Sequence, residues 1–309
     1  MTLRTLPGAT DQPPALRRRR RPRGAAAVWG VVGVVALVGV WELYKLLGPA
    51  EGVVLGGNRI LPRTTDLAMP HSWDMLGRLL EPVTSSPTAD PLWWAVAQAA
   101  ALTFGIAAAG LAVGLVVGVG LALVMLRWRI AEWGILPWIV LSQTVPLIAF
   151  APLVRSWGSR IELGAFSWQD WMSVAVIASY LAFFPIAIGA LRGLQSPDAI
   201  HVELMRTYDA GWWTTLIRLR LPAAVPFLLP ALRLGAANAV IGAVVAEVST
   251  GLQGGIGRML IQFAGQASGD PEKAWGPIFG AVVLGLVAAG SVALLGLLLR
   301  DYRRAEGTA

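Results

Sequence analysis

The sequence predicts an all-α integral membrane protein, on the basis of its composition and the lengths of its apolar segments. Hydrophobic residues make up 56% of the 309 residues and charged residues only 14%, with a mean hydropathy of +0.63. A soluble domain has about 25% charged residues. Six apolar segments qualify or nearly qualify as helical spans, which need about 20 residues. The chain has no cysteine, and His71 and His201 lie far apart, so we expect no disulfide and no metal site.

Six transmembrane helices are predicted, separated by polar segments. They cover residues 25–47, 97–126, 132–154, 171–191, 224–246 and 276–299. The apolar stretch that contains the second span begins at Leu92, and as one helix 92–126 would be about 50 Å long. We therefore expect its first residues, including Trp93 and Trp94, to lie at the membrane interface.

Basic residues predict that the N-terminus and the C-terminus are both cytoplasmic. With this orientation the inner segments carry 16 of the 25 lysines and arginines and the outer segments carry seven. The segment 192–223 then lies inside, and 48–91, 155–170 and 247–275 lie outside. The six arginines between positions 17 and 23 fit an orientation signal, with a tail for nucleic acid or specific lipids as the alternative. Their place beside an apolar run favours the signal, so no nucleic-acid partner is expected.

The predicted organisation follows from these segments. Residues 1–24 form a disordered basic cytoplasmic tail, 25–91 a first span with an extracytoplasmic loop, 92–304 the core and 305–309 a second tail. The first apolar run is longer than the 7–15 residues of a signal-peptide core, so we expect a retained anchor in the cell membrane.

Residues 203–222 form a polar, amphipathic segment between two spans. Ser196, Pro197 and Asp198 predict a helix start, with Ser196 at the N-cap. Apolar residues then recur at helical spacing, at Met205, Tyr208, Trp212, Leu216 and Leu219. Such a helix could lie on the membrane surface or offer a docking surface to a soluble protein, and its place between two spans favours docking.

The same segment resembles the cytoplasmic signature loop of ABC importer permeases. Glu203 opens the motif, Ala210 follows the position of the signature glycine, and Leu221-Pro222 closes it at the expected distance. Leu204 and Met205 replace two alanines, and Asp209 stands where the family usually has glycine. The resemblance implies an ATPase-docking surface made by Glu203, Arg206, Asp209, Ala210, Gly211, Leu221 and Pro222.

Further segments are similar to the nitrate, sulfonate, taurine and pyrimidine-precursor group of these permeases. They are 142–153, 183–194, 221–235 and 247–257, so the likeness covers roughly residues 95–300. It implies a type I ABC importer fold, a pair of permeases that is most simply a homodimer, two ATPase copies and an extracytoplasmic solute-binding protein. ATP is expected on the ATPase, because this chain has no P-loop sequence, and neither catalysis nor a bound cofactor is expected here.

Four residues in or near the spans are candidates for the translocation path: Gln143, Pro146, Arg233 and Glu247. Each also has a structural alternative. Gln143, with Thr144, could hydrogen-bond to a neighbouring helix, Arg233 could pair with a polar neighbour, and Glu247 could lie at the outer interface. A stand-alone secondary transporter or channel remains the alternative function, although spans nearly free of charge argue against proton coupling.

Three repeated patterns also need an explanation. Pro222, Pro226 and Pro230 share one helix face, where they mark either a harmless kink or a bend that shapes the path. Gly110, Gly114 and Gly118 permit close helix packing, within the chain or between two copies. Residues 254–257 predict a turn or re-entrant loop. The stretches 203–208 and 241–243 favour the pyrimidine-precursor branch for the solute.

Overall fold

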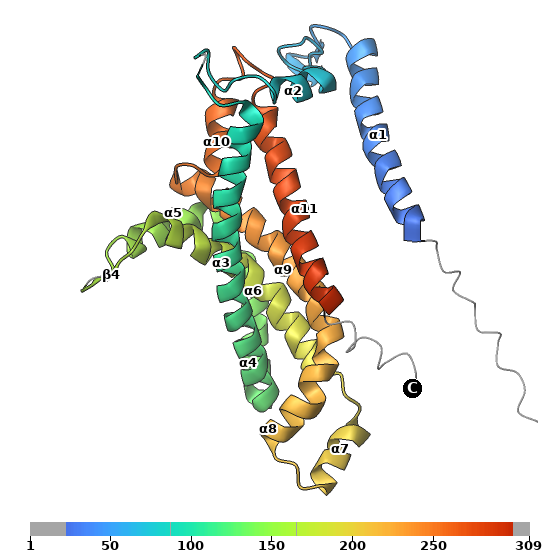
Figure 1. Ribbon diagram of the computed structural model, residues 1–309, viewed down its shortest axis with the longest axis vertical. Coiled ribbons are helices and arrows are strands. Elements are labelled where there is room, and N and C mark those ends of the chain that lie inside the picture. The colour runs from blue at the N-terminus through green and yellow to red at the C-terminus, as the bar shows by residue number, and fades with distance from the viewer. Residues whose placement is uncertain (1–22, 87, 165, 299–309) are drawn as a thin grey trace, which may run out of the picture. The chain divides into compact units, whose positions relative to one another are not determined.

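The computed structural model describes residues 23–298, except 87 and 165, and these fall into two units, 1–65 and 66–309 (Figure 1). Unit 1 contains α1 (Arg23–Leu47) and a hairpin of β1 (Val53–Leu55) and β2 (Asn58–Leu61). Gly56 and Gly57 have φ angles of 59° and 83°, which suits the tight turn between these strands. Hydrogen bonds from Tyr44 to the carbonyl of Pro62 and from Thr64 to that of Gly48 hold the hairpin to the end of α1.

Unit 2 is a helical bundle. Its elements are α2 (Ser72–Arg78), α3 (Leu92–Arg127), α4 (Arg129–Ser142), α5 (Leu147–Gly158), β3 (Glu162–Leu163), β4 (Phe166–Ser167), α6 (Asp170–Leu194), α7 (Ala199–Thr207), α8 (Trp212–Thr215), η1 (Leu216–Arg220), α9 (Leu221–Thr250), α10 (Ile256–Ala264) and α11 (Trp275–Leu298). In Figure 1, α7 and α8 lie at one end of this bundle and α2 and α10 at the other. The β-strands form antiparallel hairpins in segments predicted to lie outside.

The core of the bundle is α6, which packs between α3 and α9. The glycine stripe of α3 makes this possible. A Cβ at Gly110, Gly114 or Gly118 would lie 2.7, 3.0 or 2.9 Å from backbone oxygens of α6. The stripe therefore packs within the chain, which decides between the two alternatives that the spacing left open.

The described residues contain five helices that are long and apolar enough to cross a membrane, or up to six if α4 and α5 count as one span. The predicted spans at 25–47, 171–191, 224–246 and 276–299 match α1, α6, α9 and α11 within a few residues. The prediction of one continuous span at 132–154 is wrong, because α4 and α5 meet at an angle of 104°. Pro146 has no N–H to continue the helix, and the Thr144 hydroxyl bonds back to the carbonyl of Leu141 at 2.8 Å.

The long apolar stretch after Leu92 is one helix of 36 residues, α3. Leu92 and Val96 are buried in a cluster with Ile256 and Phe263 of α10, whereas Trp93 and Trp94 are exposed by 48 and 44%. The position of these two tryptophans at the membrane interface stays a prediction. The predicted tails at 1–24 and 305–309 lie outside the described residues, apart from positions 23 and 24 at the start of α1.

Candidate functional site

The predicted docking segment contains a short helix whose side chains are all at least partly exposed. None of the nine residues of α7 is buried, and Glu203 and Arg206 are both exposed. The helix begins after Asp198, and the prediction of Ser196 as N-cap is wrong. The Ser196 hydroxyl instead donates to the carbonyl of Gly193 at 2.8 Å, which closes the end of α6.

A tight turn ends α7 and separates it from α8. Asp209 has φ 52°, and it is the one residue other than glycine with a positive φ in the part of the chain that the structure describes. The N–H groups of Asp209 and Ala210 donate to the carbonyls of Arg206 and Met205, at 2.9 Å each, which is the Schellman pattern. Asp209 therefore adopts the conformation that favours glycine, whereas Gly211 has an ordinary φ of −61°. The predicted continuous apolar stripe from 205 to 219 is wrong, because this turn interrupts it.

Beyond the turn, α8, η1 and α9 form one helical stretch, Trp212–Thr250. The π-turn η1 immediately precedes Leu221-Pro222, and the Leu221 N–H bonds to the carbonyl of Leu216. Pro222 has no N–H to donate, so the change of pitch sits where regular hydrogen bonding is interrupted. Pro222 occupies the first turn of α9, and Pro226 and Pro230 lie within a helix that continues past them.

The base of the docking segment is fastened to α6 by a residue that the sequence argument did not single out. Arg220 donates from Nη1 to the carbonyl of Leu194 at 2.8 Å. The Ser196 hydroxyl also lies 3.4 Å from the carbonyl of Ala223. The two ends of segment 195–220 are thus held together, while α7 between them stays exposed.

Among the candidates for the path, Glu247 is fully buried and fixes the start of α10. Its Oε1 lies 2.8 Å from the Thr103 hydroxyl, and its Oε2 accepts the N–H of Gly257 at 2.8 Å. Thr103 also accepts the N–H of Ile256 at 3.0 Å. Side chains from α3 and α9 therefore satisfy two N–H groups of the first turn of α10, whose N-cap, Gly255, has no side chain.

The glycines at 254–257 allow this contact. Gly254 has φ 89°, and a Cβ at Gly255 or Gly257 would collide with the Glu247 side chain. The prediction of a turn at this place is confirmed. Thr103 was missed because nothing in the local sequence of α3 shows that it faces a residue 144 positions later.

The other three candidates for the path lie elsewhere. Gln143 and Pro146 flank the break between α4 and α5, where Gln143 donates to the hydroxyl of Ser142 at 3.2 Å. The expectation that Gln143 and Thr144 bond to a neighbouring helix is wrong, since both bond to residues of their own chain segment. Arg233 is exposed on α9, beside Gly296 of α11, and makes no hydrogen bond or ion pair with any described residue.

An ion pair anchors α5 at the end of the bundle away from α7. Arg155 contacts both carboxylate oxygens of Asp170 at 3.1 and 2.7 Å, and it also donates to the carbonyl of Thr250. The start of α6 and the end of α9 are thereby tied to α5. Beside this ion pair is a hollow of about 390 Å³, which contains none of the four candidates for the path.

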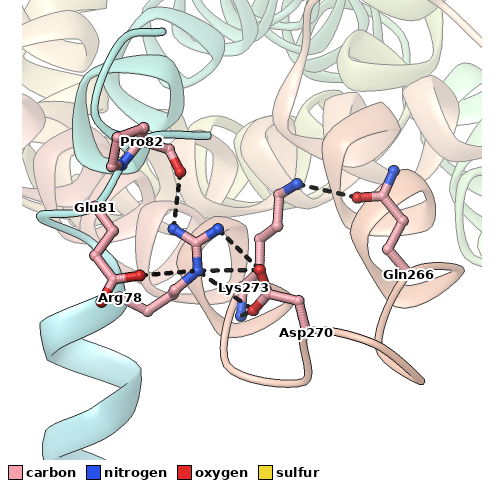
Figure 2. A network of polar contacts seen from close by, with 6 residues as sticks. All are labelled: Arg78, Glu81, Pro82, Gln266, Asp270 and Lys273. Carbon is pink, nitrogen blue, oxygen red and sulfur yellow. Dashed lines mark hydrogen bonds and ion pairs between the residues drawn. The ribbon is translucent and has the colours of Figure 1, made fainter. Parts of the chain in front are cut away.

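At the same end, a polar network joins α2 to the loop before α11 (Figure 2). Arg78 holds Asp270 with contacts of 3.0 and 2.8 Å to Oδ2, and it donates to the carbonyl of Pro82 at 3.0 Å. Burial acts to raise the pKa of Asp270, but the hydrogen bonds and charge of Arg78 outweigh it and hold that pKa below its ordinary value. Lys273 donates to Gln266 at 3.0 Å, and burial lowers its pKa.

Comparison with known proteins decides the family. The family described as binding-protein-dependent transport system inner membrane component matches residues 88–304. The chain belongs to this family. It is therefore a multi-pass transport permease, with the all-α fold of type I ABC importers, and it is a transport component rather than a catalytic subunit. A stand-alone secondary transporter or channel is not favoured.

Individual relatives agree with this membership. A formylaminopyrimidine transport permease of Halalkalibacterium halodurans is 33% identical over 208 residues, 66% of this chain and 77% of the relative. A putative aliphatic sulfonates transport permease of Bacillus subtilis is 31% identical over 54% of this chain and 56% of its own length. A nitrate import permease of Leptolyngbya laminosa is 24% identical over 85% of this chain and 81% of its own length.

Proposed function

We propose that this permease belongs to an ATP-driven importer in which an ATPase docks on α7 and the turn that follows it. The observation that carries the proposal is the exposure of α7: none of its residues is buried, although both ends of its segment are fastened. An exposed helix with a fixed base suits a contact that must transmit force. Membership of a binding-protein-dependent family supports an extracytoplasmic binding protein as the second partner.

The proposed assembly holds two copies of this chain, two ATPase copies and one path between the permeases. The break at residues 143–146 supports a path on this face, because Thr144, Val145 and Pro146 are exposed. Irregular backbone at membrane depth is tolerated only where protein covers it or where it lines a water-filled cavity. A second permease copy around a water-filled path would supply that cover, and Gln143 and Pro146 would then line the path.

Arg233 supports the same arrangement. A charge near the middle of a span costs at least about 2.5 kcal/mol on insertion scales. The exposed Arg233 has no partner among the described residues, so a wet path or a second copy would have to face it. Its positive charge would also suit a solute that carries negative charge or strong hydrogen-bond acceptors.

For the solute we propose a small polar molecule of the kind named for the relatives. Those names are formylaminopyrimidine, aliphatic sulfonates and nitrate. We place the pyrimidine type first, because that relative is 33% identical over two thirds of this chain. Both termini and the docking segment would face the cytoplasm, where ATP is available, as the distribution of basic residues also predicts.

The docking proposal can be tested with Glu203→Lys. A charge reversal on an exposed docking helix removes a charge-assisted contact, which is worth about 1.5–3 kcal/mol. We expect the variant to reach the membrane in normal amounts but to lose most of the co-purifying ATPase and most uptake. Glu162→Lys is the matched control, because Glu162 is also exposed but lies in the β3–β4 hairpin, which lies beside α5 and away from α7. Normal ATPase recovery with normal uptake in Glu203→Lys would remove Glu203 from the docking surface.

The energy source is tested in vesicles that contain the permease with and without the ATPase. Formylaminopyrimidine, sulfonate and nitrate are offered as probes together with the binding protein. Uptake is expected only when the ATPase and ATP are present. Uptake by this chain alone, driven by a proton or sodium gradient, would overturn the proposal.

A further inference from the structure

The corner between α3 and α4 presents two arginines that have no acidic partner among the described residues. Arg127 ends α3 and Arg129 begins α4, and both are exposed. Neither makes a hydrogen bond or an ion pair with any described residue. The nearest acid along the chain, Glu132, is already engaged, because it accepts a hydrogen bond from Gln195 at 3.1 Å. The described part of the chain therefore leaves the charge of this corner unbalanced.

Aromatic rings hold these guanidinium groups in place. The Arg127 guanidinium lies 5.9 Å from the ring centres of both Trp128 and Trp212, and that of Arg129 lies 5.8 Å from the ring of Trp133. Such contacts leave the N–H edges of a guanidinium free to bind an oxyanion in a planar, bidentate way. Two pre-positioned cations without counter-charge suit a ligand that carries phosphate oxygens.

An apolar stripe runs along α4 from this corner. Its exposed members are Ile130, Trp133, Trp138 and Leu141, with exposed fractions of 84, 71, 71 and 53%. They recur at intervals of three to five residues and so follow one side of the helix. This surface complements a phospholipid: the basic and aromatic groups suit the anionic headgroup, and the apolar stripe suits the acyl chains.

We propose that Arg127 and Arg129 bind the phosphate of an anionic phospholipid whose acyl chain lies along the apolar stripe of α4. The ligand is a membrane lipid rather than a protein, because the same surface continues into the exposed apolar stripe of α4. Since Arg127 also contacts Trp212 of α8, the lipid would sit at the foot of segment 195–220.

Binding is measured on the full-length protein by native mass spectrometry, after release from nanodiscs of phosphatidylcholine with phosphatidylglycerol. The wild type should retain phosphatidylglycerol preferentially. Arg127→Gln with Arg129→Gln should weaken that retention roughly thirtyfold, from about fivefold for each charge. The control pair Arg63→Gln with Arg160→Gln removes the same charge from other exposed positions and should retain the lipid normally. Arg127→Lys with Arg129→Lys keeps the charge and should keep most of the binding.

Three results would overturn the proposal. Equal retention of phosphatidylcholine and phosphatidylglycerol by the wild type would show that charge selects nothing here. Unchanged retention by the glutamine pair would place the lipid elsewhere. Loss of ATPase co-purification by the glutamine pair, with lipid retention intact, would assign the corner to the ATPase. Thermal unfolding of each variant in detergent shows whether a loss of lipid retention reflects unfolding. If the glutamine pair unfolds, the lysine pair serves as the test, because it should keep most of the binding.

Discussion

Glu247→Ala is the sharpest test of how the end of the bundle near α10 is held together. The substitution removes the acceptor of the buried Gly257 N–H, while Thr103 still accepts the N–H of Ile256. An unpaired buried donor costs about 1–3 kcal/mol, and the loss of one buried methylene group adds about 0.8 kcal/mol. The Thr103 hydroxyl is spared, because the carbonyl of Ala99 lies 3.0 Å away. We therefore expect a loss of about 2–4 kcal/mol, reduced by whatever it cost to bury the carboxyl group.

Glu247→Gln provides the control within the same site. The glutamine oxygen can accept the Gly257 N–H, and its amide can donate to Thr103 Oγ1. The Thr103 hydrogen then turns to the carbonyl of Ala99, so the Gly257 N–H and the Thr103 hydroxyl both stay paired. We expect the glutamine variant to be nearly as stable as the wild type, and the alanine variant to be less stable than both. Glu162→Ala removes an exposed carboxylate and should have little effect.

The assay is chemical unfolding of the purified protein in detergent, followed by tryptophan fluorescence, with vesicle uptake measured in parallel. A glutamine variant as unstable as the alanine variant would refute the hydrogen-bond reasoning. A glutamine variant that is stable but transports nothing would show that the charge of Glu247 serves the path.

Three further predictions test other parts of the molecule. Asp209→Gly should stabilise the protein by up to about 1 kcal/mol in the same unfolding assay, because glycine adopts φ 52° without strain, whereas Ala210→Gly should not. The pKa of Asp270 is held below its ordinary value of about 3.9, so its contribution to stability is complete above that value and is lost as the pH falls through the lowered pKa. Hydrogen exchange in 265–275 should then rise only in acid, but in Asp270→Asn at every pH. Thr214→Cys should react with an impermeant thiol reagent only when the membrane is opened, and labelling of intact cells would contradict the cytoplasmic docking segment.

Much of the fold could be predicted from the sequence, because a span must satisfy a simple rule of length and apolarity. Residues 171–191 and 276–299 meet that rule and form α6 and α11. The same rule failed at 132–154, since hydropathy cannot show that Pro146 and a hydroxyl from Thr144 divide an apolar run into two helices. It also could not show that Leu92 and Val96 pack against α10, because that contact joins segments far apart in the sequence.

The candidate docking segment was predictable in place but not in shape. The motif located Glu203 and Leu221-Pro222, and both lie in the exposed segment at one end of the bundle. The helical periodicity could not reveal the turn at Asp209, because the apolar residues on its two sides happen to keep their spacing. Long-range contacts such as Arg220 with Leu194 and Glu247 with Thr103 leave no trace in any local window.

Glu247 and the second part of the candidate docking segment, α8 and η1, belong to one stretch of helix, which suggests how the two ends of the bundle would be coupled. Trp212–Thr250 comprises 39 residues, about 59 Å at 1.5 Å per residue. At one end the π-turn beside Pro222 and the bond from Arg220 to α6 form a point about which α8 could tilt. At the other end Glu247 joins the stretch to α10. A tilt imposed on α8 would therefore reach α10 only if α9 moves as a rigid body, and the close packing of small residues between α6 and α9 favours sliding over bending. Pro226 and Pro230 would then leave α9 continuous, and the tilt of α8 would be concentrated at η1.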